Sequence, residues 1–428
     1  MNREERRERR QKDTKNATVI FIIFMLVVVL LVAGVAFAVN KFVLTDRPTA
    51  EEGQTESQTE EVLVTEEVEA PVVPVIDEAT TRAAEFVAGM TLEDKVAQMF
   101  VVTPDALTGF SGVTAAGDTT KDWYNKRPVG GIVYMSENLK DREQTATMLT
   151  NMQTIATERT GLPVFLCVDE EGGSVARIAG NSAFGVTDVG SMSDIGATGD
   201  SQNAYNAGTV IGGYLSELGF NVDFAPVADV LTNGEDNAIG DRSFGADSTL
   251  VAEMVTSELE GLSDAGVYGT VKHFPGHGAV TGDSHEGVVT TTRTLEELMA
   301  AELIPFQSAI DSDVCFVMVG HIAAPSVSGD NTPASLSKVM ITDVLRTQMG
   351  YNGIVITDAM NMGAITENYG ADEAAVMAVQ AGADMILMPD DYEKAYNGLL
   401  DAVKNGTISE ERINEALIRI VKVKQQMQ

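Results

Sequence analysis

Short apolar runs rich in β-branched residues alternate, from residue 82 onward, with longer stretches in which apolar positions recur at helical spacing. Eight of the short runs have the length and composition of buried strands. They cover residues 97–102, 130–134, 164–168, 222–225, 268–272, 315–319, 354–357 and 385–387. Helical spacing is clear in the intervening stretches 201–218, 250–265 and 295–310. Strands that alternate with helices predict a parallel sheet, and eight such units predict an α/β fold, a (β/α)8 TIM-type barrel over residues 81–428.

The N-terminal segment combines a basic stretch with a long apolar one. Residues 1–16 contain seven Lys or Arg and four acidic residues, whereas residues 17–39 contain no charged side chain. As a helix, the apolar stretch would be about 35 Å long, which is enough to cross a bilayer. The basic flank predicts a cytoplasmic tail at 1–16 and places the remainder outside the membrane. We therefore expect a single-pass membrane anchor; the alternative is a cleaved signal peptide and a secreted protein, because Ala36-Phe37-Ala38 resembles a cleavage site.

Residues 40–80 have the composition of a tether. Between Thr45 and Thr80 the chain has eleven acidic residues, one Arg and no aromatic side chain. Such a segment cannot bury enough apolar surface to offset its ordering entropy. The sequence thus predicts a disordered, acidic linker that is rich in Thr, Glu and Pro.

Charge and cysteine content argue against nucleic acid as a partner and against a disulfide framework or a cysteine-based metal site. The formal net charge is −34, and no basic patch follows residue 16. A polyanion would be repelled, so nucleic acid is not an expected partner. Cys167 and Cys315 are the only cysteines, too few for a disulfide framework or a cysteine-based metal site. We expect a monomeric barrel without a cofactor.

Side chains capable of chemistry gather at or shortly after the ends of the predicted strands, where TIM barrels form their active sites. These positions carry Asp169, Asp229, Lys272, His273, His321, Asp358 and Asp390. Asp358 follows three apolar residues and a Thr, and a buried carboxylate there must have partners or a raised pKa. The alternative for Asp358 is a structural cap of the next helix. Arg177, Arg242 and Lys272 are expected to converge near the barrel mouth and keep Asp358 ionised.

Three of the four histidines, His273, His277 and His285, lie within thirteen residues. The HxxxH spacing of the first two resembles a zinc motif, but the Phe-Pro-Gly between them predicts a loop and no third ligand is near, so no metal is expected. Asp283 precedes His285 by two residues in a Gly-rich loop. Its carboxylate can accept the Nδ1 proton of the ring and leave Nε2 free for proton transfer. A surface loop in which the two residues make only turn hydrogen bonds is the alternative.

Ten short motifs follow one another along the predicted barrel. They are MTLEDKVAQMFVV at 90–102, VGGIVYM at 129–135, VDEEGG at 168–173, FAPVADV at 224–230, GDRSFG at 240–245, KHFPGHG at 272–278, DSH at 283–285, ITDAM at 356–360, AGADMILMPDD at 381–391 and ISEERINEALIRI at 408–420. In this order they resemble the single-domain β-N-acetylglucosaminidase branch of the family 3 glycoside hydrolases. KHFPGHG with a downstream DSH is the most specific of them.

The resemblance implies a retaining mechanism in two steps. Asp358 matches the family nucleophile, which attacks the anomeric carbon and forms a glycosyl-enzyme intermediate. His285 matches the acid/base of this branch, which replaces the second carboxylic acid of most retaining glycosidases, and Asp283 matches its orienting partner. Many relatives carry a second α/β domain; here we expect the acid/base to come from the barrel's own loop.

The resemblance also implies a set of residues that hold the hydroxyls and the N-acetyl group of the non-reducing-end sugar. They are Asp169, Arg177, Arg242, Lys272 and His273. His321 and Asp229 are implied to support the site from behind, against the nucleophile strand or Lys272, and His277 to serve loop structure. Ser174 stands where relatives often have Arg.

The activity that the resemblance implies is exo-hydrolysis of terminal β-linked N-acetylglucosamine from cell-wall or other amino-sugar glycans outside the membrane. A phosphorylase is one alternative, because a neutral His repels phosphate less than a carboxylate does. A β-glucosidase of the same family is a second alternative. The alternative that is not an enzyme is an inactive, membrane-tethered barrel that binds the cell wall.

Overall fold

The computed structural model describes residues 77–232, 238–280, 282–284 and 287–427. The expected cytoplasmic tail and membrane anchor, the expected linker up to residue 76, and His285 lie outside the described residues. Within the described ranges, no helix combines the length and the apolar character that crossing a bilayer requires. Helix α2 (Glu78–Ala88) starts three residues inside the expected linker, because the Asp77 carboxylate accepts a hydrogen bond from Thr80 N at 2.8 Å and caps the helix.

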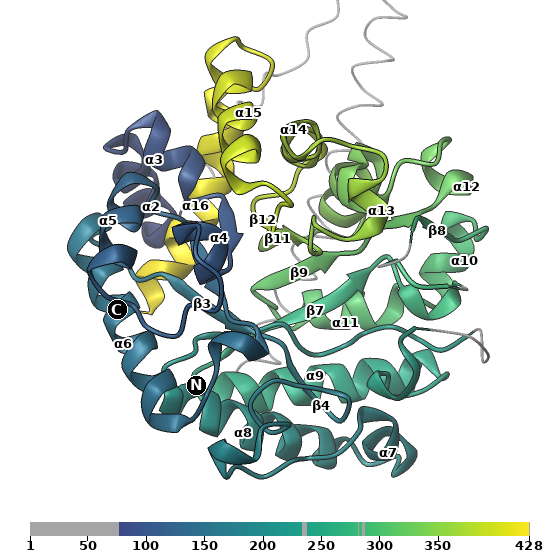
Figure 1. The fold of residues 1–428 in the computed structure, drawn as a ribbon. Helices are drawn as coiled ribbons and strands as arrows, with labels where there is room; N and C mark the ends of the chain where they lie inside the picture. Colours follow the sequence, from purple (N-terminus) through teal and green to yellow (C-terminus); the bar gives the residue numbers. More distant parts are fainter. Residues whose placement is uncertain (1–76, 233–237, 281, 285–286, 428) are drawn as a thin grey trace, which may run out of the picture. The chain divides into compact units, whose positions relative to one another are not determined.

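Eight parallel strands of the described chain form the barrel (Figure 1). They are β1 (Phe100–Val102), β2 (Gly131–Val133), β3 (Phe165–Val168), β6 (Val222–Asp223), β7 (Tyr268–Phe274), β9 (Phe316–Val319), β11 (Ile354–Thr357) and β12 (Ile386–Leu387). Neighbours follow the chain order, β12 pairs with β1, and a parallel bridge between Ile356 and Met385 links β11 to β12. The nearly closed parallel barrel confirms the predicted TIM-type α/β fold.

All eight predicted strands are present, and their ends differ from the predicted bounds by up to three residues. The start of the predicted first strand is helical, because α3 (Leu92–Ala97) is capped by Thr91, whose side chain accepts from Asp94 N. Strand β7 runs two residues beyond its predicted end, to Phe274. Lys272 and His273 therefore lie within a strand, and the peptide bond between them is cis.

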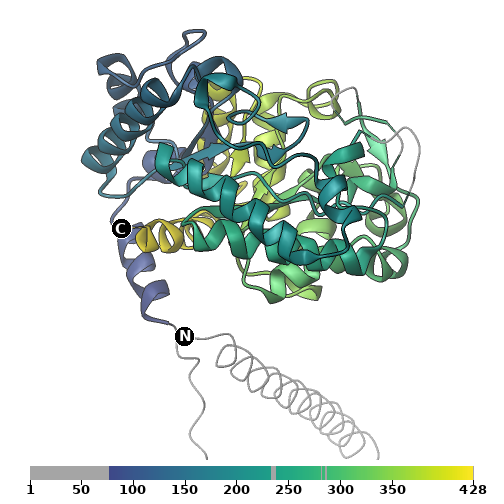
Figure 2. The same ribbon diagram turned by 90° about the horizontal axis from the view of Figure 1, so that it is seen from below.

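Helices surround the strands in the barrel arrangement of Figure 1. The remaining helices are α4 (Pro104–Thr108), α5 (Asp118–Lys126), α6 (Arg142–Thr160), α7 (Met192–Ala197), α8 (Ser201–Leu218), α9 (Ser248–Asp264), α10 (Leu295–Ala300), α11 (Ile304–Asp311), α12 (Pro325–Ser328), the π-helical η6 (Val339–Gln348), α13 (Gly363–Thr366), α14 (Ala371–Ala381), α15 (Tyr392–Lys404) and α16 (Glu410–Gln426). Helix α2 packs beside α16, so the first and last helices of the described domain are neighbours (Figure 2). The ion pair of Lys422 with Asp77, at 2.7 Å, joins the same two segments.

The helix expected over 295–310 is wrong, because this stretch forms two helices, α10 and α11. Pro305 lies in the first turn of α11, where its missing N–H and fixed φ are tolerated. In a continuous helix its ring would clash with the carbonyl of Ala301. Ala301 instead leaves helical geometry, with φ −142° and ψ −78°. The break places Glu302 between the two helices.

Side chains close the barrel at its N-terminal end. The rings of Phe165 and Tyr268 pack edge-to-face against Phe316, with centroids 5.2 and 6.3 Å away. Lys424 of α16 is fully buried there, with Nζ 2.7 Å from Gln98 Oε1 and 4.9 Å from the centre of the Phe165 ring. Burial lowers the pKa of Lys424 to about 7. The closed N-terminal end leaves the opposite end of the barrel for a site.

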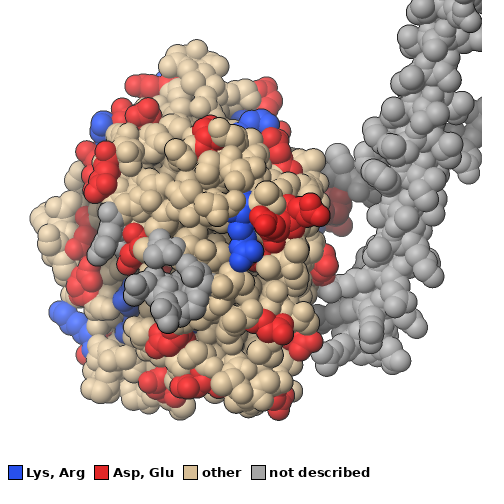
Figure 3. Space-filling model, turned by 90° about the vertical axis from the view of Figure 1, so that its right-hand side faces the viewer, with Lys and Arg blue, Asp and Glu red and all other residues tan. Residues whose placement is uncertain are grey.

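The surface agrees with the acidic composition. Figure 3 shows a face on which acidic side chains are scattered and basic ones form small, separate groups. This face offers no continuous basic patch for a nucleic acid backbone.

Candidate active site

A cavity of about 380 Å³ opens at the C-terminal ends of the barrel strands. Strands β2, β3, β6, β7, β9, β11 and β12 all contribute residues to its lining, at or near their ends. The sequence-predicted site residues in the lining are Asp169, Arg177, Arg242, Lys272, His273, Asp283 and Asp358. The structure thus brings together residues that are separated by up to 189 positions, in a volume typical of small-molecule sites.

Lys272 is the central cation of the cavity. Its side chain is 3% exposed, and Nζ lies 3.0 Å from Asp169 Oδ1 and 2.5 Å from Glu171 Oε1. Arg242 donates to the same Glu171 through two bonds, Nε to Oε2 at 2.7 Å and Nη2 to Oε1 at 2.8 Å. This two-bond fork holds both planar groups in a single orientation. Lys272 and Arg242 line the cavity, as expected, and both form ion pairs with Glu171. Lys272 also helps to lower the pKa of Asp358.

Glu171 is a site residue that the sequence analysis missed. It lies on β4 (Glu170–Gly172), which pairs antiparallel with β5 (Val175–Ala176) after the end of β3. Burial alone would raise the pKa of Glu171, but Lys272 and Arg242 outweigh that effect and lower the pKa to about 2. The one available signal was its position in VDEEGG, two residues after Asp169. Its partners could not be identified from sequence, because Lys272 lies on β7 and Arg242 in a short turn far beyond the end of β6.

Arg177 lies at the edge of this charge network. Its Nη2 is 3.8 Å from Asp169 Oδ2, and its side chain is 30% exposed. Arg177 therefore lies on the cavity wall, near the barrel mouth as expected, but it is more exposed than Lys272 and Arg242. Nearby, Ser174 Oγ donates to Asp241 Oδ1 at 3.0 Å. This bond ties the β4–β5 turn to the segment that carries Arg242.

Asp229 is fully buried behind the cavity and fixes His273. Its Oδ2 lies 2.7 Å from His273 Nδ1, and its Oδ1 accepts the backbone N–H groups of His273 and His277 at 3.3 and 2.5 Å. A carboxylate at Nδ1 selects the tautomer that carries the proton there, and directs the other ring nitrogen away from it. Lys272 was one of the expected partners of Asp229. The carboxylate instead binds the neighbouring residue, His273.

Asp358 lies one residue beyond β11 and is partly exposed to the cavity. Its Oδ1 accepts the N–H of Ala359 at 2.8 Å. Burial would raise its pKa, but the imidazoles of His273 and His321, the Ala359 N–H and Lys272 together lower it below its ordinary value. The carboxylate is therefore ionised at neutral pH.

His321 is fully buried next to the Asp358 backbone. Its Nε2 donates to the carbonyl of Ala359 at 3.0 Å, and Nδ1 lies 2.7 Å from Ser335 Oγ. Because Nε2 is the donor, a neutral ring accepts the Ser335 hydroxyl proton at Nδ1. The residue holds the turn that follows β11.

The loop after β7 brings a further acid, Asp283, to the cavity. Asp283 and Ser284 both line it, and His277 Nε2 lies 3.2 Å from Ser284 Oγ. His277 is 3% exposed, and burial lowers its pKa, so its ring is neutral at pH 7. The residue was expected to serve loop structure alone, but it also forms part of the cavity wall. His285 itself lies outside the described residues.

Among the described residues, no group of three or more His, Cys, Asp or Glu side chains has the geometry to hold a metal ion. Charged and polar side chains dominate the part of the cavity around Asp358 and Lys272. An ionised carboxylate at a strand end, a second acid on an adjacent loop and fixed charges around a small polar cavity are the parts of an enzyme that attacks a hydroxyl-rich substrate.

Comparison with known proteins assigns the family. The model of the glycosyl hydrolase family 3 N-terminal domain matches residues 91–423. The chain belongs to this family and is a glycoside hydrolase. Beta-hexosaminidase LpqI of Mycobacterium tuberculosis is 34% identical over 366 residues, which cover 83% of this chain and 88% of that protein.

Solved structures agree with the assignment. A family 3 β-N-acetylglucosaminidase from Paenibacillus sp. FPU-7 aligns with a TM-score of 0.74 and 40% identity, over 79% of this chain and 63% of that one. A family 3 glycosyl hydrolase from Mycobacterium smegmatis aligns with a TM-score of 0.69 and 35% identity, over 79% of this chain and 98% of that one. Beta-hexosaminidase A of Pseudoalteromonas piscicida is 32% identical, and the chain spans about half (53%) of its length.

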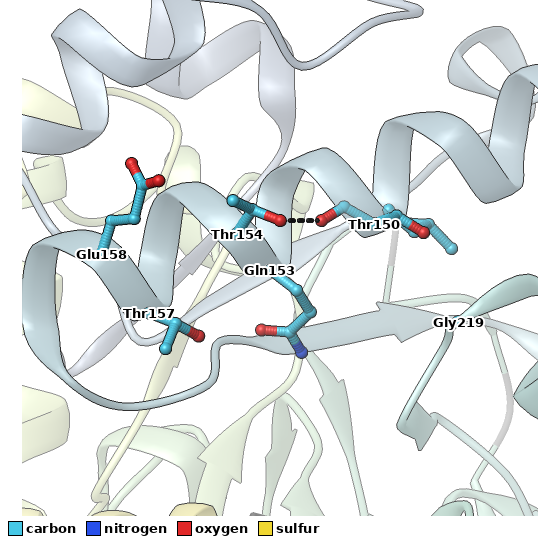
Figure 4. A pocket seen from close by; sticks show the side chains of 7 residues that line it. Thr150, Gln153, Thr154, Thr157, Glu158 and Gly219 are labelled. Carbon is cyan, nitrogen blue, oxygen red and sulfur yellow. Dashed lines mark hydrogen bonds between the residues drawn. The ribbon is translucent and has the colours of Figure 1, made fainter.

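A second depression, of about 600 Å³, lies along α6 (Figure 4). Its lining includes Thr150 and Thr154. The Thr154 hydroxyl donates to the Thr150 backbone carbonyl at 2.9 Å. Glu158 is the titratable side chain in the lining, and it pairs with Lys121 at 2.7 Å. No residue of this depression lines the cavity of Asp358, so we assign it no part in the chemistry.

Proposed function

We propose that this chain is a retaining exo-β-N-acetylglucosaminidase that removes terminal β-linked N-acetylglucosamine from amino-sugar glycans. The observation that carries the proposal is the cavity in which the ionised Asp358 lies together with Lys272, Asp169 and the Asp283–Ser284 loop. Family membership supports it, and so do the hexosaminidase and N-acetylglucosaminidase names of relatives that cover most of the chain.

In the first step, a carboxylate oxygen of Asp358 attacks the anomeric carbon of the sugar and the glycosidic C–O bond breaks. The product is a glycosyl ester of Asp358 and a free leaving-group oxygen. The lowered pKa of Asp358 keeps the nucleophile ionised, and the N–H of Ala359 at Oδ1 holds its orientation. Water then hydrolyses the ester with overall retention of configuration.

His285 is the proposed acid/base for both steps, with Asp283 as its partner. The ring gives a proton to the leaving oxygen in the first step and takes one from water in the second. The presence of Asp283 in the cavity lining supports this assignment. General acid–base catalysis of this kind contributes about 10²–10⁴-fold.

The proposed sugar contacts are Asp169, Arg177, Arg242, Lys272 and His273. Lys272 has three N–H donors, of which Asp169 and Glu171 take two, so one is left for a sugar hydroxyl. Glu171 takes two N–H groups of the Arg242 guanidinium. Arg242 therefore acts on the sugar chiefly by holding Glu171, which in turn fixes the position of Lys272.

We further propose that residues 17–39 anchor the protein in the cell membrane and that residues 40–77 hold the catalytic domain outside it. The apolar length of the first segment and its basic flank support this proposal. Membrane fractionation with protease treatment of intact cells tests it. A full-length protein in the soluble cytosolic fraction would contradict the proposal, whereas a shortened, secreted protein would indicate a cleaved signal peptide.

The test of the activity compares aryl β-N-acetylglucosaminide with aryl β-glucoside, each with and without phosphate. We expect release of free N-acetylglucosamine from the first substrate in both buffers. Sugar 1-phosphate as the main product would identify a phosphorylase, and preference for the glucoside would identify a β-glucosidase. No turnover of either substrate would support the inactive barrel. Trapping with a 5-fluoro sugar should add its mass to the peptide that contains Asp358.

A further inference from the structure

A second glutamate of β4 is fully buried but does not line the catalytic cavity. This residue, Glu170, directly precedes Glu171 in the strand. Successive side chains of a strand point to opposite faces. Glu171 faces the cavity, so Glu170 faces away from it, towards helix α8. The Glu170 carboxylate therefore stands apart from the charge network of Lys272.

The Glu170 carboxylate binds the segment after β5 and helix α8. Its Oε2 accepts the N–H of Ile178 at 2.8 Å, and its Oε1 accepts the N–H of Ala179 at 2.8 Å. Oε1 also accepts the hydroxyl of Tyr214, on α8, at 2.7 Å. The backbone N–H of Glu170 donates to Oδ1 of the fully buried Asp223, on β6, at 3.0 Å. Glu170 thus connects the segment after β5 to α8 and to the barrel sheet.

The backbone that Glu170 binds is the one that carries Arg177, which follows β5 and directly precedes Ile178. The chain turns tightly there, because the N–H of Gly180 donates to the Ala176 carbonyl at 3.2 Å. A Cβ at Gly180 would lie only 2.4 Å from that oxygen. With the backbone fixed on its C-terminal side, Arg177 points to the cavity wall, where its Nη2 lies 3.8 Å from Asp169 Oδ2.

The Arg177 side chain is held less firmly than the other two cations of the cavity. It is 30% exposed, whereas the side chains of Arg242 and Lys272 are 16% and 3% exposed. Its distance of 3.8 Å from Asp169 is longer than a hydrogen bond. A partly exposed ion pair of this length does little to fix a long side chain. The position of the guanidinium therefore depends on the backbone from which it extends.

We propose that Glu170 is a positioning residue that places Arg177 for the terminal sugar by binding the backbone after Arg177. The proposal rests on the proposed function, in which Arg177 contacts this sugar. Glu170 does not line the cavity that contains Asp358, so it acts on sugar binding and not on the bond-making step. A loss of binding that is equal for substrate and transition state raises KM and leaves kcat unchanged.

Glu170→Gln is the principal variant, because it keeps the size of the side chain but has a single acceptor oxygen. Whichever way the amide is turned, the N–H of Ile178 or that of Ala179 loses its acceptor.

Glu258→Gln is the matched control. Glu258, on α9, is also fully buried, and its carboxylate oxygens have no hydrogen-bond partner among the described residues. Burial raises the pKa of Glu258 to about 8, so the group is largely protonated at pH 7 and Gln resembles its neutral form. The two variants thus share the same substitution in a buried place, but only one of them releases the backbone of Arg177.

Kinetics on an aryl β-N-acetylglucosaminide separate binding from chemistry. A hydrogen bond to a charged group is worth about 10–100-fold in binding, so Arg177→Ala should raise KM by about this factor. We expect Glu170→Gln to raise KM about tenfold and to change kcat less than about threefold. Glu258→Gln should change neither value. An unchanged KM in Glu170→Gln, or a fall in kcat as large as the rise in KM, would overturn the proposal.

A double-mutant cycle tests whether Glu170 acts through Arg177. Where Arg177 is already replaced by Ala, Glu170→Gln should raise KM further by less than about twofold. A tenfold rise in both backgrounds would overturn the proposal, because Glu170 would then act on the site by another route.

Tyr214→Phe is the second variant, and it keeps the proposal testable if Glu170→Gln does not fold. It removes only the hydroxyl that donates to Glu170 Oε1. It should raise KM about two- to threefold in the wild-type background and leave KM unchanged beside Arg177→Ala. No rise in the wild-type background, or the same rise in both, would contradict the proposed role of Glu170.

Hydrogen exchange provides a readout that does not depend on activity. In Glu170→Gln, the backbone amides of Ile178 and Ala179 should exchange at least about tenfold faster than in wild type or Glu258→Gln. Unchanged exchange of both amides would show that Glu170 does not hold this backbone. If wild type turns over no aryl substrate, the proposed function fails, and the exchange rates alone decide whether Glu170 fixes the segment of Arg177.

Discussion

Replacing Glu171 by Gln tests the buried charge network most directly. The substitution keeps the size of the side chain but removes the negative charge that Lys272 and Arg242 share. The pKa of Glu171 is lowered from 4.5 to about 2, which corresponds to about 3 kcal/mol of stabilisation of its ionised form. Breaking a buried ion pair by removing one partner costs about 3–5 kcal/mol. We therefore expect the free energy of unfolding at pH 7 to fall by about 3 kcal/mol.

Urea denaturation at pH 7 measures this loss, with Glu217→Gln as a control. Glu217 is 67% exposed and pairs with Arg142, so its charge should contribute less than about 1 kcal/mol. The pH dependence adds a second criterion. Because the folded-state pKa of Glu171 is lowered, its stabilisation is present above pH 4.5 and is lost as the pH falls towards 2.

The difference between wild type and Glu171→Gln should therefore shrink over this acidic range. A loss of less than about 1 kcal/mol at pH 7 would refute the reasoning. A loss that persists unchanged at the lowest pH would also refute it, since the effect would then come from packing and not from charge. In activity assays, the variant should raise KM for the aryl N-acetylglucosaminide, because Lys272 loses one of the two acids that hold it.

Asp358→Ala should abolish turnover of aryl N-acetylglucosaminide, and His285→Ala should lower it by about 10²–10⁴-fold; wild-type-like rates in both would contradict the mechanism. Asp229→Asn removes the acceptor of the His273 Nδ1 proton, a bond worth about 1.5–3 kcal/mol, so kcat/KM should fall about 10–100-fold with little change in the circular dichroism spectrum. Lys424 is neutral in the folded state above pH 7 and charged in the unfolded state. The free energy of unfolding of wild type, relative to that of Lys424→Met, should therefore rise by about 1.4 kcal/mol per pH unit between pH 7 and 10. A pH-independent difference in urea denaturation would show that burial does not lower the Lys424 pKa.

Much of the fold was predictable because its determinants are local. Eight apolar runs of strand length, separated by helical spacing, led to the correct number and order of strands. The expectation failed at 295–310, where Pro305 interrupts a helical pattern of apolar residues. Hydrophobic periodicity reports which face of a helix is buried, but it does not report a break in the backbone hydrogen bonds.

The sequence predicted most of the residues that line the candidate site, but it did not predict which of them form ion pairs with one another. Strand-end positions identified Asp169, Lys272 and Asp358, because a barrel gathers all strand ends at one rim. The residue that was missed, Glu171, is 71 positions from Arg242. Nothing in its neighbourhood along the chain marks it as the shared partner of Arg242 and Lys272.

The sequence by itself determined the eight-strand barrel, the family and the rim at which the chemistry lies, since each follows from short-range patterns and strand ends. Only the tertiary structure decided which charges meet: Lys272 and Arg242 at Glu171, His273 at Asp229, and Arg293 at Glu302. The physical reason is that a charge interaction depends on distance and burial. Both are set when the barrel closes, and neither is written in the spacing of residues along the chain.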